Sequence, residues 1–201
     1  MPPELLPRAL EHLEMVAITI LVASAVGIPA AALLAHRPSG ARWALWFANI
    51  GQTVPSLALF GFLIPIHYIG GIGQHTAIEA MCLYALLPIL RNALTGLTGV
   101  DPAVRESAIA MGMTSSQILR QVELPLAAPS IMAGVRIATV STIGTATIAA
   151  AIGGGGLGTF IFRGIAMVDS HTILAGAVPA AILAIAADEV LEWIERRLAP
   201  A

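Results

Sequence analysis

The sequence predicts an all-α protein that crosses a membrane about five times and forms one transmembrane domain over residues 1–201. Of its 201 residues, 57% are hydrophobic and only 11% are charged, whereas charged residues make up about 25% of an average soluble domain. In addition, five apolar stretches approach the ~20 residues that a helix needs to cross a bilayer. These observations together indicate a polytopic membrane protein.

The predicted spans follow the apolar stretches in chain order, over residues 13–35, 44–66, 76–97, 128–151 and 172–194. The second span contains Pro55 and Gly61, and the third contains Pro88. Membrane helices tolerate such residues where neighbouring groups satisfy the backbone atoms that they free. The residues before the first span lack the pattern of a removable signal peptide, so we expect that span to stay in the membrane.

The positions of the arginines predict the orientation, because positive charge collects in cytoplasmic loops. The N-terminal segment carries more glutamates than arginines, and the segment 152–171 contains only Arg163. Six arginines lie on the other side, after the first, third and fifth spans: Arg37, Arg42, Arg105, Arg120, Arg196 and Arg197. We therefore expect the N-terminus outside and the C-terminus in the cytoplasm.

A polar, arginine-bearing stretch, DPAVRESAIAMGMTSSQILRQVELP, occupies residues 101–125 on the predicted cytoplasmic side. Asp101 is suited to cap a helix whose first residue is Pro102. Gly112 is suited to end that helix in the left-handed conformation. We expect Val104, Ala108 and Met111 to share one face of this helix.

A second helix is predicted within the same stretch. Thr114 and Gln117 have the spacing of a capping box, which starts a helix, and we expect Pro125 to end it. The two helices and the glycine between them form an elbow over residues 101–125. Packed helices need connections of only about two to eight residues, so we expect a partner to dock on this elbow.

Several classes of function lack their sequence signatures. The chain has no lysine and therefore no GxxxxGK[ST] phosphate-binding loop. Its single cysteine, Cys82, provides neither a disulfide nor a cysteine metal site. An intramembrane hydrolase is a weak alternative, because no GxSxG or HExxH motif occurs. A self-contained channel is a third alternative, but it would not require the elbow.

Three ionisable residues lie inside predicted spans, where a charge costs about 2.5–3.5 kcal/mol at the bilayer centre. Arg91 and Arg136 either extend to the inner surface or face the interior of the bundle, near Asn92 and Thr139. Glu79 lies near the outer end of its span, so we expect it to be solvated.

The glycine-rich run at 153–158 formally contains GxGxxG. It follows a membrane span and has no acidic residue about 20 positions further on, so it does not predict a dinucleotide site. Two interpretations of these glycines stay open: close packing against a neighbouring helix, and a hinge at the outer gate.

The elbow residues Glu106-Ser107-Ala108, Gly112, Val122 and Leu124-Pro125 have the spacing EAA-x3-G-x9-I-x-LP. This pattern resembles the EAA motif of permease subunits of binding-protein-dependent ABC importers, with Ser107 for alanine and Val122 for isoleucine. The resemblance implies the fold of a type I importer permease, whose coupling helix sits in a cleft of a cytoplasmic ATPase. The expected ATPase-coupling residues are Glu106, Ser107, Ala108, Gly112, Leu124 and Pro125.

The resemblance covers most of the chain, through the segments TVPSLALFGFLIP at 53–65, LLPILRNALTGL at 86–97 and IGGGGLG at 152–158. These are similar to the osmoprotectant subfamily, which carries glycine betaine, choline or carnitine. A permease of the methionine type, which also has five spans, is the alternative. Aromatic residues, which hold quaternary ammonium groups through cation–π attraction, are only 5% of the chain. We therefore expect substrate recognition to lie largely in a separate binding protein.

The resemblance also implies the partners and the mechanism. The partners are an ABC ATPase dimer, a second permease chain that is identical or homologous, an extracytoplasmic substrate-binding protein and the inner-membrane bilayer, with no nucleic acid. ATP and Mg²⁺ would be bound by the ATPase, and this chain would be a transport subunit, without catalytic residues, cofactor or metal, that works by alternating access. The candidate residues for the pathway or gate are Phe60, Tyr84, Arg91, Asn92, Arg136, Gly153 and Gly156, with Phe62 and Tyr68 as further aromatic candidates.

Overall fold

A computed structural model of the chain describes residues 3–66 and 71–198, so Tyr68 lies outside the described residues. Every regular element in these two ranges is a helix, as the sequence predicts. Four helical stretches in the described part are long and apolar enough to cross a membrane. They are α1 (Leu5–Leu34), α4 (Gln74–Thr98), the stretch Ser115–Ile152 that contains α7 (Leu124–Ala149), and α9 (Ser170–Leu198).

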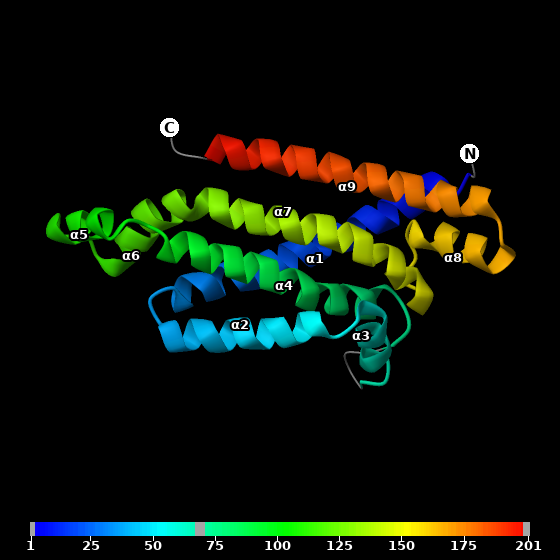
Figure 1. Ribbon diagram of the computed structural model, residues 1–201, viewed down its shortest axis with the longest axis horizontal. Helices are drawn as coiled ribbons and strands as arrows, with labels where there is room; N and C mark the ends of the chain where they lie inside the picture. Colours follow the sequence, from blue (N-terminus) through cyan, green and yellow to red (C-terminus); the bar gives the residue numbers. More distant parts are fainter. Residues whose placement is uncertain (1–2, 67–70, 199–201) are drawn as a thin grey trace.

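The long helices run lengthwise through an elongated bundle (Figure 1). α4 and α7 form its central pair, α1 packs against both, and α9 lies along α7. The elbow helices and the C-terminal end of α9 lie at one end of the bundle, and the N-terminus lies at the other. The arginine-bearing segments therefore gather at one end, as the predicted orientation requires.

The core consists largely of alanine and glycine, which let membrane helices approach closely. One close approach joins α4 and α7 at Gly134. A Cβ atom there would lie 2.7 Å from the Cβ of Asn92 and 2.8 Å from the carbonyl oxygen of Pro88. One turn further along, a Cβ on Gly96 would lie 2.8 Å from the Cβ of Ser130.

The single span expected over 44–66 is two shorter helices, α2 (Pro38–Thr53) and α3 (Ser56–Leu63). Val54 and Pro55 between them are extended, with ψ of 127° and 136°. The cause is local, because the ring of a proline disfavours the helical conformation in the residue before it. α2 lies beside α4, and α3 runs at an angle to α2 (Figure 1).

The segment expected as an outer loop, 152–171, contains a helix of its own. A short 3-10 turn (Ala150–Ile152) ends α7, and α8 (Gly158–Met167) follows the glycine run. α8 packs against α9 at the end of the bundle opposite the elbow (Figure 1). The glycine run therefore joins two packed helices.

Candidate functional site

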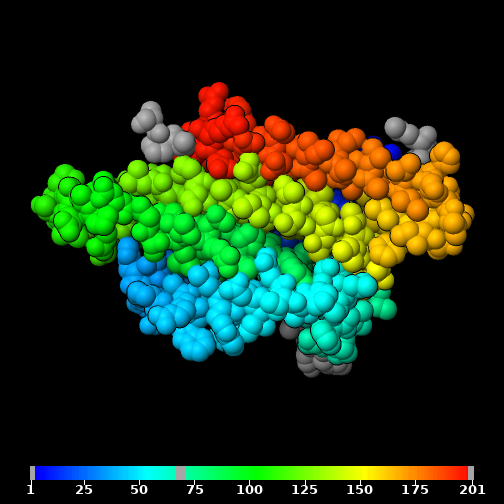
Figure 2. Space-filling model, in the orientation of Figure 1, coloured from blue at the N-terminus to red at the C-terminus, as the bar shows by residue number. Residues whose placement is uncertain are grey.

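The elbow forms as its local signals predict and protrudes at one end of the molecule (Figure 2). Asp101 caps α5 (Pro102–Ala110) by accepting a hydrogen bond of 2.8 Å from the backbone N–H of Ala103. Gly112 follows the helix with φ of 81°, in the left-handed region. Thr114 and Gln117 form the complete capping box that starts α6 (Ser115–Ile118). The prediction of two capped helices is confirmed.

The expectation that Pro125 ends the second helix is wrong. A π-turn, Leu119–Glu123, follows α6 directly and leads into α7 without a break. The backbone N–H of Leu124 bonds to the carbonyl of Leu119, five residues back. Pro125 therefore lies inside a continuous helical stretch, directly after the π-turn, and contributes no N–H to its hydrogen bonds.

The expected coupling residues differ in their exposure. Glu106, Ser107, Gly112 and Pro125 are exposed, and Leu124 is half-buried. Ala108 is buried, whereas Val104 and Met111 are exposed, so these three residues do not form one accessible face. The exposed surface of the elbow therefore contains both polar and apolar side chains, and Ala108 is buried beneath that surface.

Sequence reasoning missed Glu123, which lies at the junction of the elbow and α7. Its side chain is only 3% exposed. Oε1 accepts a hydrogen bond of 3.2 Å from Nε of Arg105 on α5, and Oε2 lies 3.1 Å from Nε2 of His36, just after α1. An acidic residue directly before the apolar run of a span was the signal that could have revealed it.

Arg91 and Asn92 lie on α4, and Arg91 faces α2. Nη2 of Arg91 donates to Oδ1 of Asn49 at 3.0 Å, and Nδ2 of Asn92 donates to the carbonyl of Pro88 in its own helix at 2.9 Å. Both residues line a cavity of about 300 Å³ between α2, α4 and α7. The other residues that line this cavity are Gln52, Leu87, Pro88, Ile137 and Ser141.

The aromatic candidates within the described residues have different surroundings, and Phe62 is exposed. Phe60 is fully buried in the core, so its ring is not available to a pathway in this conformation. Tyr84 is half-buried, and its hydroxyl donates to the carbonyl of Val54 at the break after α2. Tyr84 thus contacts the break between α2 and α3.

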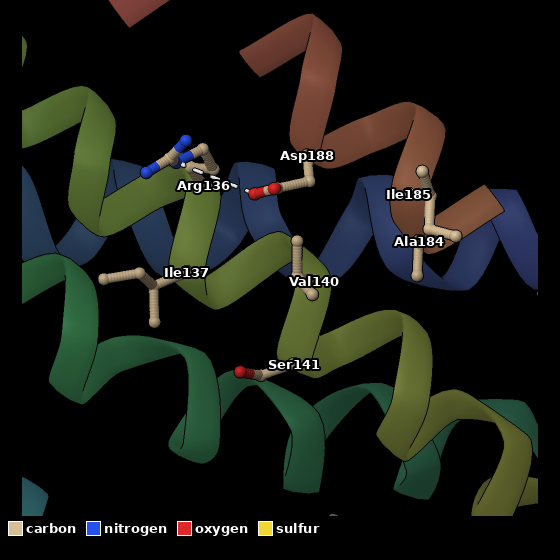
Figure 3. Close-up of a pocket in the computed structure, with 7 residues that line it drawn as sticks. All are labelled: Arg136, Ile137, Val140, Ser141, Ala184, Ile185 and Asp188. Atoms are coloured by element: carbon tan, nitrogen blue, oxygen red, sulfur yellow. Dashed lines mark ion pairs between the residues drawn. The ribbon is translucent and has the colours of Figure 1, made fainter. Parts of the chain in front are cut away.

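Arg136 pairs with three carboxylates of α9. Its guanidinium lies 3.7 Å from Asp188, 3.3 Å from Glu192 and 3.3 Å from Glu195. Figure 3 shows the pair with Asp188 beside a cavity of about 370 Å³ that side chains of α7 and α9 line. The three acids recur at spacings of four and three, so they share one face of α9.

The glycine run packs against the N-terminal end of α1. The backbone N–H of Gly156 donates to Oε2 of Glu11 at 3.1 Å. A Cβ on Gly156 would lie 3.0 Å from Cε of Met15 and 3.1 Å from Nδ1 of His12. Gly153 is exposed and has φ of 79°. Close packing and a φ of 70° both account for Gly156, and a left-handed turn accounts for Gly153.

Glu79 was expected to be solvated, but it is half-buried on α4. Its Oε2 atom is buried and has no hydrogen-bond partner within the described residues. Across residues 3–66 and 71–198, no group of three His, Cys, Asp or Glu side chains is arranged to hold a metal ion.

A bundle of membrane-length helices with a capped polar elbow at one end defines a transport permease. Residues 23–200 match the family of binding-protein-dependent transport system inner membrane components, so the chain belongs to this family. It is a membrane subunit of an ABC importer and works with an ATPase and a substrate-binding partner.

Two relatives are similar over nearly the whole chain. The choline transport system permease protein OpuBB of Bacillus subtilis (strain 168) is 46% identical over 98% of this chain and 90% of that protein. The glycine betaine/carnitine/choline transport system permease protein OpuCB of the same organism is 45% identical over 98% of this chain and 89% of that protein. The resemblance to osmoprotectant permeases is confirmed.

Among solved structures, an inward-facing form of the MetNI methionine ABC transporter matches with a TM-score of 0.88. The match covers 100% of both chains, at 26% sequence identity. The expected fold of a type I importer permease is therefore confirmed. The methionine transporter is the more distant neighbour, because its identity to this chain is well below that of the osmoprotectant relatives.

Proposed function

We propose that this chain is the subunit through which quaternary-amine osmoprotectants such as glycine betaine, choline or carnitine cross the cytoplasmic membrane. The observation that carries the proposal is the 45–46% identity to permeases of such compounds over 98% of the chain. The exposed elbow, with Glu106 and Gly112 on its surface, supplies the surface that an ATP-driven importer needs.

The proposed orientation places the N-terminus outside and the elbow in the cytoplasm. The gathering of the arginine-bearing segments at the elbow end supports it, because positive charge stays on the cytoplasmic side. Each elbow would dock on one subunit of an ATPase dimer, which would bind ATP and Mg²⁺. The binding protein would then meet the end formed by α8 and the N-terminus.

The polar side chains around Arg91 support a pairing of two permease chains. Arg91, Gln52 and Ser141 are exposed in the single chain, although they lie on helices of the membrane bundle. An arginine facing lipid is costly, so such residues face a protein neighbour or a water-filled cavity. A second permease chain would cover this face, and the pathway would run between the two chains.

Transport would follow from rocking of the two chains against each other, a general mode of alternating access. Closure of the ATPase dimer on ATP would draw the two elbows together and open the pathway to the loaded binding protein. Hydrolysis would return the pathway to the inward-facing state. The continuous helix from Ser115 to Ile152 would carry movement of the elbow into the membrane.

The test is uptake by proteoliposomes that hold this chain with its own ATPase and binding protein. We expect ATP-dependent uptake of radiolabelled glycine betaine, choline or carnitine, and stimulation of ATP hydrolysis by the loaded binding protein. ADP in place of ATP is the control. Uptake of methionine but of none of the three quaternary amines would overturn the proposed substrate class.

A further inference from the structure

Glu123 occupies a junction to which three parts of the molecule contribute. We infer that it is a positioning residue for transport: its carboxylate holds the elbow in register with the membrane helices, so that elbow movement reaches the pathway. The inference rests on the proposed docking of the elbow, but it concerns how this chain transmits the movement.

The first support is the burial of the charge. Glu123 lies at the inner end of the bundle with its side chain only 3% exposed. A carboxylate is buried at such a place only where partners compensate its lost hydration. Arg105 and His36 supply that compensation, Arg105 at Oε1 and His36 within 3.1 Å of both carboxylate oxygens.

The second support is how little else holds α5. Ala108 is the only buried residue of this helix. α5 packs mainly against α6 and the π-turn, and the lengthwise helices of the bundle pack mainly against one another. The hydrogen bond from Arg105 is therefore the specific polar link between the docking helix and the start of α7.

The third support is the contact between Glu123 and His36, which links the elbow to the end of α1. His36 follows α1 directly, and α1 runs the length of the bundle to the glycine run at its far end. A displacement of α5 would thus act on α7 and on α1 through the same carboxylate. The π-turn matters here, because π-turns inside helices frequently mark functional sites, and this one ends at Glu123.

The test separates coupling from folding with variants of the complete importer. Arg105→Gln combined with Glu123→Gln removes both charges, so it breaks the ionic link without leaving a charge buried and unpaired. We expect the complex to assemble with normal basal ATP hydrolysis, while substrate transported per ATP falls about tenfold, a typical size for a coupling effect.

Two matched variants are the controls. Arg105→Lys keeps the positive charge and should retain most of the transport per ATP. Arg120→Gln removes an exposed arginine from the same elbow and should leave the ratio unchanged. A normal ratio in the double variant, or an equal loss in Arg120→Gln, would overturn the inference.

A distance measurement on the full-length permease in nanodiscs does not depend on transport. Spin labels at exposed Leu33 and Met111, with Cys82→Ser, report the separation of α1 and the elbow. We expect one narrow distribution in the parent protein and in Arg120→Gln, and a broadened one in the double variant. An unchanged distribution would contradict the positioning role, whereas failed uptake by the parent importer would contradict only the proposed function.

Discussion

The side-chain amide of Gln52 donates a hydrogen bond of 2.8 Å to the backbone carbonyl of Tyr84. That carbonyl lies four residues before Pro88, which has no N–H to offer it. The Tyr84 hydroxyl donates in turn to the carbonyl of Val54, in the break between α2 and α3 that Pro55 causes. Gln52 and Tyr84 thus each donate to a backbone carbonyl of the other segment, beside a proline.

This relationship predicts that Gln52→Leu destabilises the protein, because it keeps the bulk of the side chain but removes the donor. A typical hydrogen bond contributes about 0.5–1.5 kcal/mol to stability. Pro88→Ala restores a backbone N–H, so Gln52→Leu should cost much less in that background. Thermal unfolding of the four proteins in detergent gives the double-mutant cycle, and equal costs in both backgrounds would contradict the prediction.

The crossing of α4 and α7 predicts a difference between two glycines of the same helix. Gly134→Ala places a methyl group 2.8 Å from the Pro88 carbonyl oxygen, and such overpacking costs about 1–3 kcal/mol. Gly144 has nothing within 4 Å of a Cβ atom, so Gly144→Ala should be neutral or stabilise by up to ~1 kcal/mol. Thermal unfolding should place Gly134→Ala below the parent protein and Gly144→Ala level with it or above it.

Arg136 predicts how firmly α9 is attached. Arg136→Gln leaves three carboxylates of α9 without their shared cation, and we expect a loss of about 1–3 kcal/mol in unfolding free energy. Arg163→Gln is the control, because its pair with Glu4 spans 3.6 Å at the surface and such pairs contribute about 0–1 kcal/mol. Limited proteolysis after α8 should accelerate only in Arg136→Gln, and equal stability of the two variants would refute this assignment.

Asp169 precedes α9 and predicts a pH dependence at the start of that helix. The Thr172 hydroxyl and the backbone N–H of His171 donate to its carboxylate, which lowers the pKa of Asp169 below its ordinary value of 3.8. Since the folded pKa is lowered, the stabilisation is present above pH 3.8 and disappears as the pH falls through the folded pKa.

Hydrogen exchange in the first turn of α9 measures this effect. We expect protection at neutral pH that declines below about pH 4 in the parent protein. Asp169→Asn keeps a capping oxygen but does not titrate, so protection in this variant should be independent of pH over the same range. A parallel decline in both proteins would show that another group is responsible.

Glu106 predicts the strength of ATPase association. Glu106→Arg reverses an exposed charge on the elbow, so we expect the ATPase to co-purify poorly while the permease keeps its thermal stability. Asp101→Asn, which preserves the helix cap, is the control for loss of one negative charge from the same helix. Normal co-purification with Glu106→Arg would argue against docking at this surface.

The features of the elbow that could be predicted from the sequence are those set by local chemistry. Asp101, Gly112 and the Thr114–Gln117 box each act through backbone groups within a few residues. Their residue types and spacing therefore determine the helix boundaries almost alone. The apolar stretches likewise predict the long helices, because the bilayer imposes their length.

The features that could not be predicted depend on groups distant in the sequence. Glu123 and His36 are 87 residues apart, and the partners of Arg136 come from α9. Pro125 was misinterpreted because a π-turn before it changes the hydrogen-bond pattern, and residue types do not announce that turn. The break at Val54–Pro55 had a visible cause, but Pro88 is the same kind of residue inside an uninterrupted helix.

The π-turn at Leu119–Glu123 has a consequence for engineering chimaeric transporters. A π-turn holds one residue more than an α-helical turn, and one residue rotates everything beyond it by about 100° around the helix axis. An elbow grafted from another permease at residues 101–118 would therefore face the correct way only if the recipient keeps those five residues. Counting residues through this junction, as well as matching its motif, decides which way the transplanted surface points.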